Sequence, residues 1–227
     1  MRDMSPAVWS QLPNALTVLR VVLAGAFFAA LNLFRYPGHQ VVWGNVAIGL
    51  FIAAAITDAL DGYLARKWRV ESVFGRVMDP FCDKVLIIGA FIYLAGPRFA
   101  VETHRPNGEI IITMVTSIYP WMVVIILARE LLVTGIRGII EGMGASGASL
   151  WSGKAKMITQ CITIPLIMFL AVNCLPTERE WARIACIVLA YSTLIVTVWS
   201  GLPYIGGLRK MIAQPKAATP RENVSAR

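Results

Sequence analysis

Long apolar runs, rather than alternating apolar and polar positions, dominate this chain of 227 residues. Each run is long enough to cross a hydrocarbon core of about 30 Å as a helix, and a helix satisfies its own backbone polar groups in lipid. A membrane β-barrel would need alternation, which the runs lack. The pattern therefore predicts an all-α, polytopic membrane protein with six transmembrane helices, at roughly residues 15–35, 41–64, 80–97, 119–141, 154–174 and 181–205.

The segments outside these spans are interpreted separately. The first dozen residues are expected to form a short N-terminal interfacial helix. The stretch from Phe99 to Ser117 is long for a connection, and we expect Ile110–Thr113 within it either to extend the fourth span or to dip into the interface. Residues 1–212 are predicted to form one membrane domain. Residues 213–227, rich in Pro, Ala and basic residues, are predicted to be a disordered cytoplasmic tail.

Composition supports a membrane protein, since hydrophobic residues make up 57 % of the chain and charged residues only 15 %. That is too little charge to cover a soluble surface. The net charge of +8 could suggest nucleic acid as a partner, but the basic residues flank apolar spans instead of forming a stripe with aromatic residues. They are concentrated between spans two and three and after span six, which predicts cytoplasmic termini. We expect contacts with membrane lipids and no binding of nucleic acid.

Four aspartates lie on the two sides of the connection between spans two and three. Asp58 and Asp61 are three residues apart, and Asp79 and Asp83 are four apart, so each pair shares a helix face. A tight connection would bring the four carboxylates together, which requires compensating cations. Carboxylate oxygens favour Mg²⁺, Mn²⁺ or Ca²⁺ over zinc, and four can hold two ions suited to phosphoryl chemistry. The alternative is that the aspartates cap helix ends or pair with Arg66, Lys67, Arg76 and Lys84, which does not explain four acids at this spacing.

Through the same stretch the chain resembles the CDP-alcohol phosphatidyltransferase family, because it matches D-x-x-D-G-x-x-A-R, eight residues, then G-x-x-x-D-x-x-x-D. The resemblance implies a six-helix membrane enzyme that transfers the phosphatidyl group of CDP-diacylglycerol to an alcohol and releases CMP. It implies that Asp58, Asp61, Asp79 and Asp83 hold two divalent cations, Mg or Mn. It also implies that Asp83 is the general base that deprotonates the acceptor hydroxyl.

The resemblance further implies a pocket for the CDP-lipid beside the aspartates. Glycine and alanine would let a flat base approach the helix backbone, and a guanidinium suits a phosphate or the cytosine edge. Polar residues that lead into the first span would lie near the nucleotide or the metals, with helix capping and a snorkelling arginine as the alternative. The CDP-lipid-binding residues expected on this basis are Asn14, Thr17, Arg20, Gly62, Ala65, Arg66 and Gly75.

Charged residues inside the fourth span bear on the identity of the acceptor. Arg129 and Glu130 lie within an apolar run, and Glu130, Thr134 and Arg137 are spaced to line one stripe of a helix. Charge inside a span is functional by default, because an unpaired charge there is costly; a structural Arg–Glu pair is the alternative. Lysines near the start of span five extend the basic set, which suits an anionic acceptor. The expected acceptor-phosphate-binding residues are Arg129, Arg137, Lys154 and Lys156.

These stretches resemble the branch of the family that uses glycerol-3-phosphate and makes phosphatidylglycerophosphate. The resemblance implies CDP-diacylglycerol and glycerol-3-phosphate as substrates, a homodimer, and a bacterial inner membrane with the active site facing the cytoplasm. Phosphatidylglycerol, as in a cardiolipin synthase, and inositol, inositol phosphate or serine are alternative acceptors. A cation transporter or channel is the alternative from another class, and it predicts acidic residues near the membrane midplane, whereas these lie at span ends.

Overall fold

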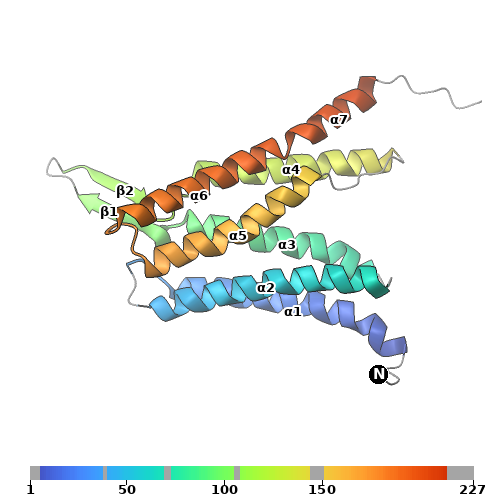
Figure 1. Cartoon of the computed structure of the whole chain (residues 1–227), viewed down its shortest axis with the longest axis horizontal. Coiled ribbons are helices and arrows are strands. Elements are labelled where there is room, and N and C mark those ends of the chain that lie inside the picture. The colour runs from blue at the N-terminus through green and yellow to red at the C-terminus, as the bar shows by residue number, and fades with distance from the viewer. Residues whose placement is uncertain (1–5, 38–39, 69–72, 105–107, 144–150, 214–227) are drawn as a thin grey trace, which may run out of the picture.

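The computed structural model consists of long helices that run side by side, with a small β-hairpin at one end of the bundle (Figure 1). It describes residues 6–37, 40–68, 73–104, 108–143 and 151–213, with side chains described except at 6–14, 16, 61–68, 73–80, 103–104 and 208–213. The elements are α1 Pro6–Leu33, α2 Val41–Trp68, α3 Val73–Leu94, a 3₁₀ turn Pro97–Phe99, β1 Ala100–His104, β2 Ile110–Met114, α4 Pro120–Gly142, α5 Trp151–Asn173, α6 Glu180–Trp199 and α7 Leu202–Ala213.

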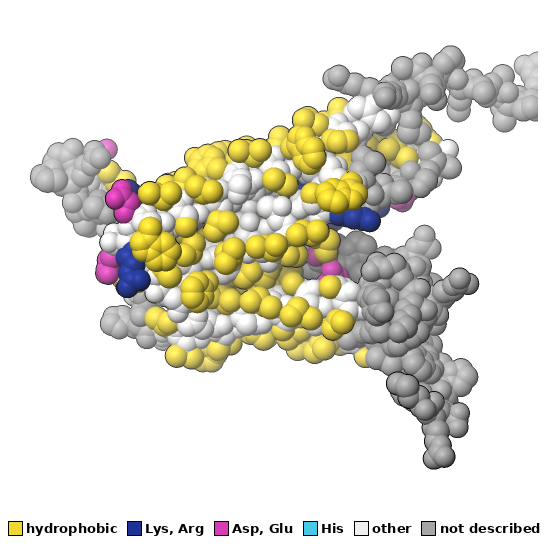
Figure 2. All heavy atoms as spheres, viewed as in Figure 1, with side chains coloured by type: hydrophobic (Ala, Val, Ile, Leu, Met, Phe, Trp, Pro, Cys, Tyr) yellow, Lys and Arg dark blue, Asp and Glu magenta, His cyan; other side chains and the backbone are white. Residues whose placement is uncertain are grey.

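The helical surface is largely apolar, as the predicted membrane location requires. Within the described residues, three stretches are long and apolar enough to cross a bilayer, namely Val41–Leu60, Trp151–Asn173 and Glu180–Gly207. Hydrophobic side chains cover the middle of the face shown in Figure 2, and charged side chains gather toward the two ends. The chain is therefore a mostly helical membrane protein.

Aromatic rings and a glycine hold the helices close together inside the bundle. Phe27 of α1 and Phe51 of α2 are fully buried, with ring centroids 5.5 Å apart. Gly44 of α2 faces α5 so closely that a Cβ atom there would lie 2.7 Å from a methyl carbon of Val172. Small residues at such positions let helix backbones approach in a membrane, where the hydrophobic effect does not drive helices together.

The connection between α3 and α4 differs from its prediction. Ile110–Thr113 does not extend the fourth span, because these residues form β2, which pairs antiparallel with β1. The β-branched run suits a strand, and α4 begins only at Pro120, where a missing N–H costs no helical hydrogen bond. The described part of the chain is therefore helical with one two-stranded sheet, and not purely α.

Both ends of the chain also depart from prediction. α1 is continuous from Pro6 to Leu33, so the residues from Pro6 onward begin the first long helix and do not form a separate short one. The predicted span at 181–205 is divided, since Ser200 and Gly201 separate α6 from α7. The predicted tail lies outside the described residues from residue 214 onward.

Candidate active site

A cavity of about 430 Å³ lies between α3, α4, α5 and α7. It joins two sets of residues that are far apart in the sequence, one from the acidic motif on α3 and one from the charged stripe on α4 and the start of α5. Gly138, Gly153, Met157 and Tyr204 complete parts of its wall. The charged and hydroxyl-bearing residues that line it are Asp83, Lys84, Arg129, Glu130, Thr134, Arg137, Glu141 and Lys156.

Asp58 and Asp83 represent the acidic motif among the described side chains. Asp58 Oδ1 on α2 lies 2.8 Å from Nη1 of Arg20 on α1, and the Arg20 side chain is only 2 % exposed. Asp83 on α3 lies within electrostatic range of Asp58, Arg20, Lys156 and Glu130. Packing of α1 against α2 and α3 thus places a buried guanidinium against the acidic motif, where it offsets part of the negative charge.

The donor atoms of this cluster fit hard divalent cations. Carboxylate oxygens from two neighbouring helices are the ligands that Mg²⁺ and Mn²⁺ prefer. In the part of the chain whose side chains are described, no three acidic, His or Cys side chains gather as a metal-binding group. Asp61 and Asp79, which complete the motif, lie on α2 and α3 with side chains outside the described set. Metal binding by the four aspartates therefore stays a prediction.

Most of the residues predicted to bind the CDP-lipid also lie outside the described side chains. Of this set, Thr17 and Arg20 are described, and both are buried on α1. The backbone places one of the others on α1 and the rest on α2 and α3 within the acidic motif, and their roles stay predictions. They are Asn14, Gly62, Ala65, Arg66 and Gly75.

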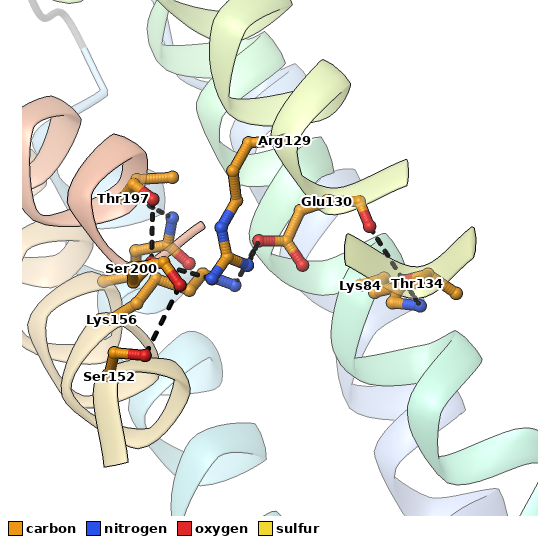
Figure 3. Close-up of polar contacts among 9 residues, drawn as sticks. Lys84, Arg129, Glu130, Thr134, Ser152, Lys156, Thr197 and Ser200 are labelled. Carbon is orange, nitrogen blue, oxygen red and sulfur yellow. Dashed lines mark hydrogen bonds and ion pairs between the residues drawn. The ribbon is translucent and has the colours of Figure 1, made fainter. Parts of the chain in front are cut away.

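Glu130 stands at the centre of a buried polar network (Figure 3). Its Oε1 accepts a hydrogen bond from Arg129 Nη1 at 2.9 Å and lies 2.6 Å from Lys156 Nζ. Arg129 Nη2 donates to Ser200 Oγ at 2.7 Å. The Arg–Glu pair that the sequence left as a structural alternative therefore exists, and it connects α4, α5 and the junction of α6 with α7.

The junction itself is shaped by this network. Ser200 is fully buried, and its Oγ donates to the carbonyl of Thr197 at 2.7 Å. A Cβ atom on Gly201 would lie 3.3 Å from Cγ of Arg129, so a larger residue would crowd the arginine. Sequence reasoning missed Ser200 and Gly201, although a Ser-Gly pair shortly before Pro203 is a recognised helix-interruption signal.

The predicted acceptor-binding residues occupy different positions. Arg129, Arg137 and Lys156 line the cavity, whereas Lys154 is exposed and is absent from the described cavity wall. Lys84, which the sequence interpretation considered only as an alternative ion-pair partner of the aspartates, also lines the cavity. Its only sequence signal is that it directly follows the last aspartate of the motif.

Comparisons with known proteins agree with the acidic motif. The sequence model of the CDP-alcohol phosphatidyltransferase family matches residues 10–199. The chain is 33 % identical over 208 residues to a probable phosphatidylglycerophosphate synthase of Mycobacterium tuberculosis H37Rv, covering 88 % of this chain and 86 % of that one. It is 29 % identical over 201 residues to the CDP-diacylglycerol–glycerol-3-phosphate 3-phosphatidyltransferase of Escherichia coli K12, covering 87 % and 94 %. The chain therefore belongs to the CDP-alcohol phosphatidyltransferase family.

Proposed function

We propose that this protein transfers the phosphatidyl group of CDP-diacylglycerol to glycerol-3-phosphate, giving phosphatidylglycerophosphate and CMP. The observation that carries the proposal is that one cavity is lined both by Asp83 of the family motif and by the cations Arg129, Arg137 and Lys156. Basic side chains around a small cavity suit an acceptor that carries a phosphate. The Escherichia coli relative is named for the same donor and acceptor, and the Mycobacterium tuberculosis relative for the same product.

The chain's own residues would act on the acceptor in this reaction. A phosphate held by Arg137 and Lys156 would fix the acceptor in the cavity, so that its hydroxyl reaches Asp83. The hydroxyl oxygen attacks the phosphorus attached to diacylglycerol, its proton passes to Asp83, and the bond from that phosphorus to the CMP oxygen breaks. Fixing the acceptor in this way converts a bimolecular encounter into a positioned one, which is a large part of enzymatic rate enhancement.

Two divalent cations, Mg or Mn, would be held by Asp58, Asp61, Asp79 and Asp83. When bound, such ions neutralise the diphosphate and stabilise the charge on the leaving CMP. Arg20, which already pairs with Asp58, would keep that carboxylate oriented and limit the repulsion within the motif before substrate arrives.

We further propose six spans, α1 to α6, in a bacterial inner membrane, with the active site and both termini in the cytoplasm. Helices of 20 to 28 residues are about 30 Å long or longer. The start of α1 and the end of α7 lie at one end of the bundle and the hairpin at the other (Figure 1), as an even number of spans requires. We also expect the homodimer that the family resemblance implies, which cross-linking in native membranes would test.

Thiol labelling in intact cells tests the orientation. In a cysteine-free background, Glu109→Cys beside the hairpin should react with a membrane-impermeant maleimide added outside. Glu141→Cys, at an exposed position of the cavity wall, should react only after the membrane is permeabilised. The reverse pattern would show that the active site faces away from the cytoplasm.

The function is tested by CMP release from purified protein supplied with CDP-diacylglycerol and Mg²⁺ or Mn²⁺, while acceptors are varied one at a time. We expect release with glycerol-3-phosphate, lost on chelation and in Asp83→Asn. Glu180→Gln, which neutralises an exposed acid at the opposite end of the bundle, is the matched control and should keep wild-type turnover.

Other outcomes separate the parts of the proposal. Release only with phosphatidylglycerol or inositol would keep the chemistry and refute the acceptor. No release with any acceptor, from folded protein, would refute the enzymatic function and favour ion transport.

A further inference from the structure

The cations that line the cavity differ in how far the chain already neutralises them. Arg129 and Lys156 share the carboxylate of Glu130 at 2.9 and 2.6 Å, and the exposed fractions of these three side chains are 12 % or less. Arg137 lies 3.9 Å from a carboxylate oxygen of Glu141, with both side chains exposed. A buried carboxylate at 2.6–2.9 Å, like that of Glu130, cancels much of the attraction that a cation exerts on an incoming anion.

Lys84 differs because its described partner is neutral. Its Nζ donates to Thr134 Oγ1 at 2.8 Å, and among the described side chains no carboxylate lies within ion-pair distance of it. Thr134 Oγ1 in turn donates to the carbonyl of Glu130 at 2.7 Å, so its lone pairs are turned toward the ammonium. Figure 3 shows Lys84 and Thr134 on the side of Glu130 away from Lys156. The threonine thus orients the lysine without neutralising it.

An ammonium held in this way can bind another anion. It has three N–H donors, and one hydrogen bond to Thr134 leaves two for other acceptors. Lys84 lines the same cavity as Asp83, and the two residues are consecutive on α3. A small acceptor that places a phosphate on Lys84 therefore brings its hydroxyl into the neighbourhood of the predicted general base.

We propose that Lys84, oriented by Thr134, is a further binding residue for the phosphate of the acceptor and selects a phosphomonoester over a neutral polyol. This inference rests on the proposed function of the same cavity. On this view Glu130 offsets part of the charge of Arg129 and Lys156, and Lys84 adds to Arg137 and Lys156 a cation that no described carboxylate neutralises.

Steady-state kinetics of Lys84 variants test the proposal. Lys84→Met keeps most of the side-chain length and removes the charge, and it should raise KM for glycerol-3-phosphate by about 10- to 100-fold, as expected for loss of a charge-assisted hydrogen bond. The kcat and the KM for CDP-diacylglycerol should change by less than about threefold, because the effect is on acceptor binding. Lys84→Arg keeps the charge and should restore most of the affinity.

Thr134 provides an independent pair of variants. Thr134→Val keeps the shape but removes the hydroxyl that orients Lys84, and it should raise KM for glycerol-3-phosphate by several-fold. Thr134→Ser keeps the hydroxyl and should remain near wild type. This pair of Thr134 variants tests the role of Lys84 even if Lys84→Met does not fold. Arg183→Gln, which removes an exposed cation at the far end of the bundle, controls for the loss of one positive charge.

Three results would overturn the inference. They are an unchanged KM for glycerol-3-phosphate in Lys84→Met, a rise in the KM for CDP-diacylglycerol instead, or a fall in kcat alone. The second result would assign Lys84 to the donor lipid. Failure of the proposed function is separate, because wild-type protein would then release no CMP in response to glycerol-3-phosphate.

Discussion

Replacing Glu130 by Gln tests whether the buried network holds the helices together. Gln has nearly the same shape and can still accept one hydrogen bond, but it no longer offsets the charges of Arg129 and Lys156. The exposed fractions of the three side chains are 9 %, 9 % and 12 % for Glu130, Arg129 and Lys156. The variant therefore leaves two buried cations without the carboxylate that they share.

The magnitude follows from the distances. At 2.9 and 2.6 Å, each ion pair has a Coulomb energy of about 6 kcal/mol at an effective dielectric constant of about 20. Desolvation offsets much of this, and breaking a buried pair by removing one partner costs about 3–5 kcal/mol. For a chain of this length such a loss lowers the melting temperature by on the order of 10 °C.

Thermal melting of detergent-solubilised protein, followed by the loss of the folded peak in size-exclusion chromatography, measures the effect. Glu180→Gln is the matched control, since it breaks an Arg–Glu pair at 3.2 Å whose side chains are 58 % and 77 % exposed. That change should lower the free energy of unfolding by less than about 1 kcal/mol. Adding Lys156→Met to Glu130→Gln removes one of the two stranded cations, so the double variant should be more stable than Glu130→Gln alone.

Equal melting temperatures for Glu130→Gln and Glu180→Gln would refute the reasoning. So would a double variant that is no more stable than Glu130→Gln alone, because removing one of the two unpaired cations should raise the stability. Either result would mean that Glu130 does not hold α4 to α5 and α6 in the folded protein.

Three further predictions use the same melt or the CMP assay. Gly44→Ala should lower the free energy of unfolding by about 1–3 kcal/mol through overpacking, because the new Cβ would lie 2.7 Å from a methyl carbon of α5. The control Gly49→Ala meets nothing within 4 Å and should be neutral or slightly stabilising. Equal effects of the two variants would contradict the packing. Ser200→Ala should lower the free energy of unfolding by about 1–3 kcal/mol, because it removes a buried acceptor of Arg129. The control is Ser192→Ala, whose hydroxyl bonds only within its own helix, and it should lower the free energy of unfolding by less than about 0.5 kcal/mol. Chelation should abolish CMP release, and Mg²⁺ or Mn²⁺ should restore it; activity that survives chelation would contradict the metal prediction.

Hydrophobic pattern alone was enough to find the long helices. The predicted span at 119–141 coincides closely with α4, and the span at 154–174 with α5. This works because burial in lipid acts on each residue through its own transfer free energy, so the signal accumulates locally along the chain. The acidic motif was equally readable, since two residues three or four apart on a helix must share a face.

The hydrophobic pattern did not predict the hairpin or the division of α6 from α7. The β-branched run at Ile110–Ile112 favours a strand, but a strand needs a partner, and β1 supplies it across a connection. Ser200 and Gly201 lie in an apolar stretch that is long enough to be one helix. Their contact with Arg129, which reaches them from α4, exists only in the folded bundle.

The sequence by itself therefore determined the membrane class and the family, and it predicted which residues carry the chemistry. Tertiary structure decided how charges are paired: Arg20 with Asp58, Glu130 between two cations, and Lys84 with a neutral hydroxyl. Apart from that of Arg129 with Glu130, which are neighbours on α4, these pairings join residues on different helices, so they depend on which helix faces pack together. Local periodicity and solvation are properties of a segment, whereas the partner of a buried charge is a property of the whole bundle.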